Sequence, residues 1–209
     1  MRHCRIVTYN VHGLRGMDGQ RDPARVLAIL KGIDADCVAL QEFVDPPRAG
    51  QGSLLGHWQE SLGLPYACHA AAFERGGEIF GNALLSRVPL DDVCEHDFSA
   101  PGCYRRVTLQ ARLHLDDGPD LAVTVVHLGL RGMAKAAQRP LLEALVRAND
   151  TPHVVLGDFN EWHPWNPTFR MLRADFAGGP ALSTFPAIAP ALALDRIWVR
   201  PKARLVSVQ

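Results

Sequence analysis

The chain has 209 residues, of which 47% are hydrophobic and 21% are charged, so it suits one globular domain with a sizeable core. Its 22 basic and 22 acidic residues balance, which argues against nucleic-acid binding through the overall field and leaves a local basic patch open. No apolar run approaches transmembrane length and the N-terminus lacks a signal-peptide core, so we expect a cytoplasmic protein, although a removed leader stays open.

The five cysteines are scattered along the chain and include no C-x-x-C pair. An odd, unpatterned set of this kind is typical of reduced, buried thiols. We therefore expect neither a disulfide framework nor a zinc site. The residues concerned are Cys4, Cys37, Cys68, Cys94 and Cys103.

The first part of the chain alternates strand and helix patterns. The β-branched run over residues 6–9 predicts a strand that ends at Asn10. An Asp-Pro pair then predicts the start of a helix over residues 22–33. The apolar run over residues 37–40 predicts a second strand, which ends in Glu42. A strand, a helix and a strand in succession is the unit that builds parallel or mixed sheets.

The middle of the chain carries weaker signals. Residues 53–62 predict a short helix, and residues 79–85 predict a strand. Prolines bracket residues 89–102, for which no element is predicted. Residues 104–115 alternate in places as a strand does, and a turn signal follows them.

Strong patterns return after residue 120. Residues 121–126 predict a strand that ends in His127. A helix is expected over residues 133–148, with Pro140 predicting a kink or a late start. The remaining expected elements are a strand at 154–156, a capped helix at 166–172, a strand at 194–199 and a pairing segment at 203–208. This alternation predicts one α/β domain with a mixed sheet.

The stretch around the strand at 154–156 is the most informative one. The strand closes in Gly157, and Asp158 and Asn160 follow on either side of Phe159. A carboxylate and an amide at the carboxyl end of a buried strand lie where open α/β sheets place their chemistry. In extended chain both would face one ligand, with Phe159 in the core. An Asx-turn, with both side chains bonded to their own backbone, explains this stretch alone equally well.

Similar polar residues recur at other strand ends. Asn10, Glu42, His127 and Asp158 each follow an apolar run, and Asp195 lies inside a later strand. Each of them alone has a structural explanation, such as a turn or a hydrogen-bonded core histidine. Chance rarely brings five such residues to one sheet edge, and burying an unpaired carboxylate is costly.

These residue types restrict the chemistry. Carboxylates with asparagine and histidine, and without a cysteine set, suit a hard divalent cation such as Mg²⁺. Asparagine and histidine can hydrogen-bond phosphate oxygens, and Asp158 can orient or deprotonate an attacking water. The sequence has no Walker-type loop, no G-x-S-x-G and no G-x-G-x-x-G motif after its first strand. The residues therefore predict hydrolysis of a phosphoester.

With these residues identified, the sequence resembles the endonuclease/exonuclease/phosphatase superfamily, and in particular its small bacterial members of undefined substrate. That superfamily includes deoxyribonucleases, abasic-site endonucleases, inositol polyphosphate phosphatases and neutral sphingomyelinases. The matching motifs occur in family order and cover nearly the whole chain. They are T-Y-N-V-H-G (Thr8–Gly13), L-Q-E (Leu40–Glu42), G-N-A-L-L-S-R (Gly81–Arg87), V-H-L-G-L (Val126–Leu130), G-D-F-N-E (Gly157–Glu161), S-T-F-P (Ser183–Pro186) and L-D-R-I (Leu194–Ile197).

The resemblance implies a four-layer α/β sandwich, in which two mixed β-sheets pack face to face with helices outside. It implies Mg²⁺, or Mn²⁺, bound by Glu42, with Asn10 helping to hold the waters of the metal. It also implies that His127 and Asn160 contact the scissile phosphate and that Asp158 positions the attacking water.

Further residues take implied roles around the phosphate. Asn82 and one of two neighbouring arginines, Arg105 or Arg106, would bind the phosphate. Of the two arginines, we predict Arg106. Asp195 would hold a catalytic histidine that the family supplies from a C-terminal S-D-H motif. No such motif follows Asp195 in this chain.

The missing histidine leaves alternatives. We expect that residues 1–209 form a single domain that lacks its C-terminal segment. The other possibility is that the histidine has been lost or replaced, and His12 and His163 are the residues that would substitute for it in principle.

We therefore expect a phosphodiesterase, nuclease or phosphatase in which water attacks phosphorus in line. The alternative is a catalytically silent module that binds phosphorylated ligands. The neutral charge and short loops favour a small or lipid-derived phosphoester, while nucleic acid and a membrane lipid head group both stay open as partners. No obligate protein partner is evident, and Trp162 and Trp165 either line one wall of the site or belong to the core.

Overall fold

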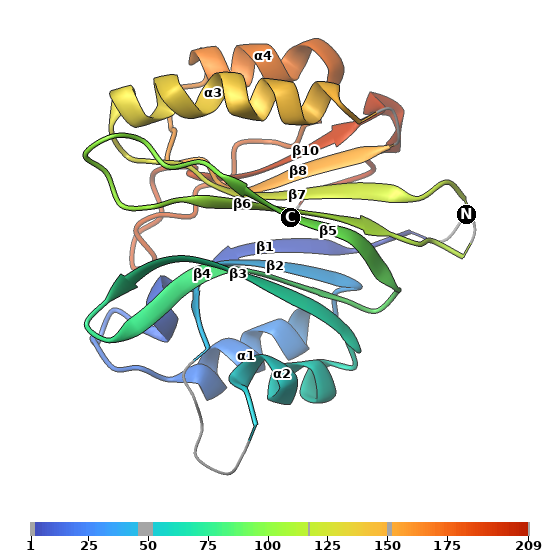
Figure 1. Ribbon diagram of the computed structural model, residues 1–209. Coiled ribbons are helices and arrows are strands. Elements are labelled where there is room, and N and C mark those ends of the chain that lie inside the picture. The colour runs from blue at the N-terminus through green and yellow to red at the C-terminus, as the bar shows by residue number, and fades with distance from the viewer. Residues whose placement is uncertain (1–2, 46–51, 117, 150–151, 209) are drawn as a thin grey trace.

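The apolar runs of the sequence become the strands of two β-sheets, which pack face to face with helices on both outer faces (Figure 1). The structure is a computed structural model that describes residues 3–45, 52–116, 118–149 and 152–208. Both sheets combine parallel and antiparallel pairs. The four-layer α/β sandwich with two mixed sheets is confirmed.

The smaller sheet is built from the first half of the chain. β1 (Ile6–Asn10) and β2 (Cys37–Val44) pair in parallel, as expected of a strand, a helix and a strand in succession. β4 (Glu78–Ser86) lies antiparallel to β2 and to β3 (Tyr66–Arg75). The strand order is β1-β2-β4-β3, so β1 and β3 are its edges.

The larger sheet takes its strands from the second half of the chain. Its central pair, β7 and β8, is parallel, and the other neighbours are antiparallel. The strand order is β5-β6-β7-β8-β10-β9. The strands are β5 (Leu90–Asp97), β6 (Val107–Leu113), β7 (Leu121–His127), β8 (His153–Asp158), β9 (Ala177–Gly178) and β10 (Asp195–Arg200).

Three helices begin at side-chain caps, which satisfy an N–H of the first turn that has no partner inside the helix. Asp22, Ser53 and Asn166 each accept a hydrogen bond from the backbone N–H three residues on, at 2.9–3.0 Å. The helices that they begin are α1 (Pro23–Ile33), α2 (Leu54–Leu62) and α4 (Pro167–Asp175).

The fourth helix, α3 (Gly132–Arg147), runs continuously through Pro140, so the late start considered from the sequence is wrong. A proline removes one helix N–H, but packing of an amphipathic face outweighs that loss here. Gln138 before the proline and Leu142 after it are both fully buried. No helix among the described residues is both long and apolar enough to cross a membrane.

The core has three layers, which follow from the four-layer architecture. Trp58 packs between the smaller sheet and its helices α1 and α2. Aliphatic side chains such as Leu109 and Leu156 fill the space between the sheets. Phe169 and Trp198 pack between the larger sheet and its helices α3 and α4. The fully buried aromatic residues of these clusters thus lie beneath the helices, and the sheets meet mainly through smaller side chains, with Phe73 partly buried between them.

Three strands, β3, β5 and the two-residue β9, do not follow from the sequence patterns. All three are edge strands, which pair on one side only and therefore tolerate polar side chains. β5 reads L-D-D-V-C-E-H-D and is largely exposed, while β3 is rich in alanine, a weak strand former.

The expected pairing of residues 203–208 with β10 is wrong. β8 and β9 already bond to the two sides of β10, so neither side remains available. Residues Lys202–Arg204 form a short 3-10 helix instead.

The thiols are less uniformly buried than expected. Cys37 lies in the core, where burial raises the pKa of its thiol. Cys94 is exposed on β5, while Cys68 and Cys103 are half-buried. All four are free thiols, as expected of a chain without a disulfide framework.

Candidate active site

The polar residues at the strand ends gather where the two sheets meet. Asn10 ends β1 and Glu42 lies near the end of β2, in the smaller sheet. His127 and Asp158 end β7 and β8 and are register partners in the larger sheet. Asp195, at the start of β10, pairs with Asp158 from the other side. The structure thus brings all five of these predicted residues to one edge of the sandwich.

Asn10 joins the two sheets at this edge. Its Nδ2 donates to Asp158 Oδ2 at 2.9 Å and to Glu42 Oε1 at 3.3 Å, so one amide holds a carboxylate from each sheet. Its Oδ1 accepts from the backbone N–H of His12 at 3.0 Å. Because both ends of the buried amide are engaged, its orientation is fixed.

Glu42 reaches the site through an irregularity in β2. The pairing of β2 with β4 shifts between Leu40 and Phe43, and Glu42 has a φ of 52°. A bulge of this kind re-aims a side chain, at a cost that the surrounding pairing must offset. Burial acts to raise the pKa of Glu42, but contacts with the neighbouring histidines and with Asn10 outweigh it and lower that pKa to about 2. Glu42 is therefore ionised at neutral pH.

His127 lies beside both carboxylates. Its Nε2 is 3.7 Å from Glu42 Oε1 and 3.8 Å from Asp158 Oδ2. Burial, together with the positive charge of Arg106, lowers the pKa of His127 to about 4, although the two carboxylates oppose that shift. The imidazole is therefore neutral near pH 7 and offers one N–H donor.

Asp158 accepts hydrogen bonds on both oxygens, with Oδ1 bound to the backbone N–H of Asn160 at 2.7 Å. The Asx-turn explanation is thus right for Asp158. Asn160 has a φ of 50°, so the expected extended chain, with both side chains on one strand face, is wrong. Asn160 Nδ2 donates to the backbone oxygen of Leu128 at 2.8 Å and ties together the segments after β7 and β8. Phe159 is fully buried, as expected.

Gly157 allows β7 and β8 to approach each other next to the site. Its φ is 140°, and a Cβ at this position would lie 2.0 Å from the backbone oxygen of Val126. A side chain there would therefore force the two strands apart. The glycine keeps His127 and Asp158 in register.

A shallow hollow opens beside Glu42 and His127, and Asn82 and Arg106 line it. Asn82 is buried and donates from Nδ2 to the backbone oxygen of Val107 at 2.7 Å. Burial lowers the pKa of Arg106, and the charges of the site's carboxylates oppose that shift. Arg105 instead donates to the backbone oxygen of Ala71 in β3. Arg106 is therefore the arginine that lines the hollow.

Asp195 is half-buried next to Asp158. Its Oδ1 is shielded from solvent and has no hydrogen-bond partner among the described residues. Burial, and then the charge of Asp158, raise the pKa of Asp195 to about 6. Asp195 is thus a carboxyl group with an unused acceptor on the strand next to Asp158.

His12 is a site neighbour that the sequence motifs did not favour. Its Nδ1 lies 3.8 Å from Glu42 Oε2, and the contact raises the pKa of His12. The sequence feature that could have identified His12 is its position two residues after Asn10, which ends β1. His163 is different, because it accepts a hydrogen bond from the backbone of Trp165, in the turn before α4.

Two tryptophans after β8 lie outside the core. Trp162 and Trp165 are exposed by 54% and 73%, so of the two positions considered from the sequence the core is wrong. Lys135 Nζ lies 5.4 Å from the ring of Trp162, and the guanidinium of Arg173 lies 5.6 Å from the ring of Trp165.

The donor set at this edge fits a hard divalent cation. Glu42 and Asp158 offer carboxylate oxygens around one space, and no thiol is among the residues that meet there. In the described residues, no group of three or more histidine, cysteine, aspartate or glutamate side chains could by itself hold a metal ion. Mg²⁺ tolerates this arrangement well, since it usually keeps several waters and takes one or two protein carboxylates.

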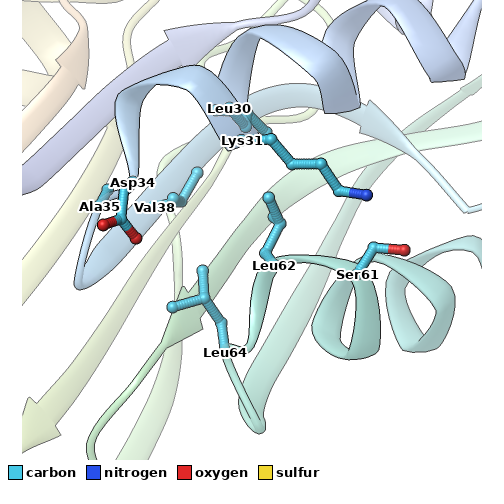
Figure 2. Close-up of a pocket in the computed structure, with 8 residues that line it drawn as sticks. All are labelled: Leu30, Lys31, Asp34, Ala35, Val38, Ser61, Leu62 and Leu64. Carbon is cyan, nitrogen blue, oxygen red and sulfur yellow. The ribbon is translucent and has the colours of Figure 1, made fainter.

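A larger hollow, of about 200 Å³, lies between α1 and α2 (Figure 2). It lies beside Val38 at the start of β2, whereas Glu42 lies near the end of that strand. Apolar residues such as Leu30, Val38 and Leu64 line it, and Lys31 and Asp34 are its charged residues. None of the predicted site residues contributes to it. The hollow therefore does not compete with the strand ends as a place for hydrolysis.

Comparison with known proteins agrees with this geometry. The family model described as "Endonuclease/Exonuclease/phosphatase family" matches residues 7–209. The chain is 29% identical over 215 residues to the uncharacterized protein YbhP of Escherichia coli (strain K12). That alignment covers 94% of this chain and 84% of YbhP.

Solved structures share the fold. An endonuclease/exonuclease/phosphatase from Beutenbergia cavernae has a TM-score of 0.76 at 22% identity, and the match covers 96% of this chain but only 65% of that protein. The mannosyl-6-phosphatase Bt3783 of Bacteroides thetaiotaomicron has a TM-score of 0.67 at 16% identity, with 95% and 85% covered. Family and neighbours together support phosphoester hydrolysis in general. Because the family model spans nearly the whole sequence, the chain belongs to the endonuclease/exonuclease/phosphatase family.

Proposed function

We propose that this chain hydrolyses a phosphoester with the help of Mg²⁺, or Mn²⁺, by in-line attack of water on phosphorus. The observation that carries the proposal is the meeting of Glu42, His127 and Asp158. These side chains come from two sheets, approach to within 3.8 Å and are linked by Asn10. Two carboxylates and a neutral N–H donor around one space suit a phosphate bound next to a cation.

Glu42 is the residue that we assign to the metal, with Asn10 fixing the carboxylate. A bound Mg²⁺ would supply positive charge against the phosphate oxygens as negative charge grows on them. Glu42 suits this role because it is ionised at neutral pH and its side chain is 24% exposed. Asn10 holds its orientation without adding charge.

Asp158 is the group that we assign to the attacking water. The hydrogen bonds from Asn10 and from the Asn160 backbone leave its carboxylate little freedom to rotate. A fixed acceptor can orient a water for in-line attack and take its proton. Asn160, tied to the segment after β7, would contact the phosphate from the same turn.

His127 and Arg106 are the donors that we assign to the phosphate oxygens, with Asn82 beside them in the hollow. A neutral imidazole donates one hydrogen bond, and a guanidinium adds positive charge and several donors. Asp195, with an unpartnered Oδ1, would position a further group that binds against it.

The test compares the wild-type chain with Glu42→Gln and Asp158→Asn on a chromogenic phosphodiester, with Mg²⁺ and with EDTA. We expect metal-dependent turnover that each substitution lowers at least about 100-fold. Glu143→Gln, a half-buried glutamate on α3 paired with Arg147, is the matched control and should keep wild-type turnover. Unchanged turnover in both site variants would refute the proposal.

A silent binding module is the second candidate, and the unpartnered Oδ1 of Asp195 favours it. If a catalytic group belongs against Asp195 and is absent, the site would bind phosphorylated ligands without hydrolysing them. Titration calorimetry with inorganic phosphate and Mg²⁺, run beside the turnover assay, separates the two functions. Stoichiometric binding without turnover supports the module.

A further inference from the structure

The most exposed apolar side chains are concentrated around the candidate active site. In the described residues, nine large hydrophobic side chains are more than half exposed. All of them except Val206 lie on segments that adjoin the edge where Asn10, Glu42, His127 and Asp158 meet. Scattered exposed hydrophobic residues are normal, but their concentration around one opening marks an interaction surface.

The register of the strands places these residues. Leu130 and Met133 follow the end of β7, and they are 68% and 76% exposed. Trp162 and Trp165 follow the end of β8, which is parallel to β7 and ends at the same level. All four therefore lie on the segments that leave the carboxyl ends of the central strand pair, where His127 and Asp158 end their strands.

Two more residues extend this group on either side. Tyr104 precedes β6, whose first residues face the end of β7 because the two strands are antiparallel. Ile188, which is 79% exposed, lies in the loop closed by the bridge between Phe185 and Leu192, and the ring of Phe185 lies 6.5 Å from the ring of His12. We call these six residues the apolar rim: Tyr104, Leu130, Met133, Trp162, Trp165 and Ile188. Met17 and Ile79 continue it beside the smaller sheet.

Two of the basic side chains at the same edge are neutralised within the protein, which weakens the case for a polyanion as the partner. Arg21 pairs with Glu78, and Lys135 pairs with Glu161 at 3.3 Å. Basic side chains that are neutralised within the protein release few counterions when nucleic acid approaches, so they add little to its binding. The whole chain also carries no net charge.

The contacts of the two tryptophans suit a lipid–water interface. Trp162 and Trp165 each lie beside a basic side chain, Lys135 and Arg173 respectively. Tryptophan with lysine or arginine is the combination that anchors proteins at the head-group level, since the ring tolerates both apolar and polar surroundings. A flat bilayer surface can also contact several separate loops at once, which a small soluble ligand cannot.

From the placement, exposure and charge of the apolar rim, we propose that it docks the candidate active site onto the surface of a phospholipid bilayer. The rim would enter the head-group region and bring lipid phosphates toward the site. Docking does not depend on hydrolysis, whereas a phospholipid phosphodiester as the substrate class rests on the function proposed above.

Flotation with phosphatidylcholine vesicles, without and with a minority of phosphatidylglycerol, tests the docking directly. We expect the wild-type chain to float with vesicles, also at about 0.5 M NaCl, because apolar insertion is not screened by salt. The double variant Trp162→Ser/Trp165→Ser should bind vesicles about tenfold or more weakly. The matched control Ile29→Ser/Val93→Ser removes two exposed hydrophobic residues away from this edge and should bind like the wild type.

Brominated lipids give a second readout on the unaltered chain. Trp58 and Trp198 are buried, so quenching of tryptophan fluorescence by these lipids reports Trp162 and Trp165. Absence of flotation and quenching in the wild type, or equal loss of binding in the rim and control variants, would overturn the proposal. Preferential binding of a single-stranded oligonucleotide, lost at high salt, would overturn it in favour of nucleic acid.

Cleavage of the water-soluble diester separates this proposal from the proposed function. If vesicle binding persists and no substrate is cleaved, docking stands and hydrolysis fails. If Trp162→Ser/Trp165→Ser cleaves the soluble diester normally but floats with vesicles as well as the wild type, the docking proposal fails and the hydrolysis proposal stands.

Discussion

The two ends of the β7–β8 pair each carry a buried histidine, and the comparison shows what distinguishes a reactive end from a structural one. His127 ends β7 opposite Asp158, and His153 begins β8 opposite Ala122. Burial lowers the pKa of both, to about 4 for His127 and about 3 for His153. A perturbed pKa alone therefore does not identify the active site.

The surroundings of the two rings make the difference. His153 Nε2 lies 2.7 Å from the hydroxyl of Thr124, and its ring packs against Phe176. His127 instead faces two carboxylates and a hollow lined by Arg106. His153 is therefore enclosed by its neighbours, whereas His127 borders the hollow.

The largest expected effect is on turnover at the His127 end. His127→Ala should lower the turnover of a chromogenic diester by about 100-fold or more, because a donor to the phosphate is lost. His127→Gln keeps an N–H donor and should recover part of that loss. Urea unfolding of both variants checks that the fold is retained. Equal turnover in His127→Ala and the wild type would remove His127 from the site.

At the other end the expected effect is on stability and not on turnover. His153→Gln disturbs the bond to Thr124 and the packing against Phe176, so it should lower the free energy of unfolding by about 1–3 kcal/mol. Turnover at saturating substrate should stay within about twofold of the wild type. A larger loss of turnover at unchanged stability would erase the distinction between the two ends.

The last expected effect is the pH dependence of stability, which builds up gradually with pH. In the unfolded chain His153 takes up a proton below about pH 6.5. In the folded chain burial keeps it neutral down to about pH 3. The free energy of unfolding should therefore fall as pH drops below 6.5, by up to about 1.4 kcal/mol per pH unit for this group, and His127 adds a share down to about pH 4. Urea unfolding at pH 7.5, 6 and 5 measures the slope.

His153→Gln serves as the control for that slope. This substitution should reduce the slope of the unfolding free energy against pH by the contribution of one histidine, while the contribution of His127 remains. If the variant and the wild type show the same slope between pH 6.5 and 5, His153 does not resist protonation in the folded state.

The central strands and much of the site could be predicted from the sequence. Buried strands such as β1, β2, β7 and β8 consist of short apolar runs, so both their position and the polar residue at their end are visible. Asn10, Glu42, His127 and Asp158 follow from that pattern alone. The edge strands β3 and β5 do not, because β5 is largely polar, as one-sided pairing allows, and β3 is rich in alanine, a weak strand former.

The rest of the site depends on contacts distant in the sequence. The bulge that directs Glu42 arises from its pairing with β4, and the backbone of Asn160 leaves the extended form in a turn held by Leu128. His12 lies beside Glu42 only because β1 and β2 are parallel neighbours. No local sequence pattern encodes these contacts. Nor does it encode the exposure of Trp162 and Trp165 on the segment that follows β8.

The most direct test of the account is a crystal of the chain soaked with Mn²⁺ and inorganic phosphate. The anomalous signal of manganese locates the metal without any assay of activity. We predict a peak at coordinating distance from the Glu42 carboxylate, with phosphate between it and His127, and its loss in Glu42→Gln. A peak elsewhere on the wild-type chain, or an identical peak in Glu42→Gln, would contradict the account.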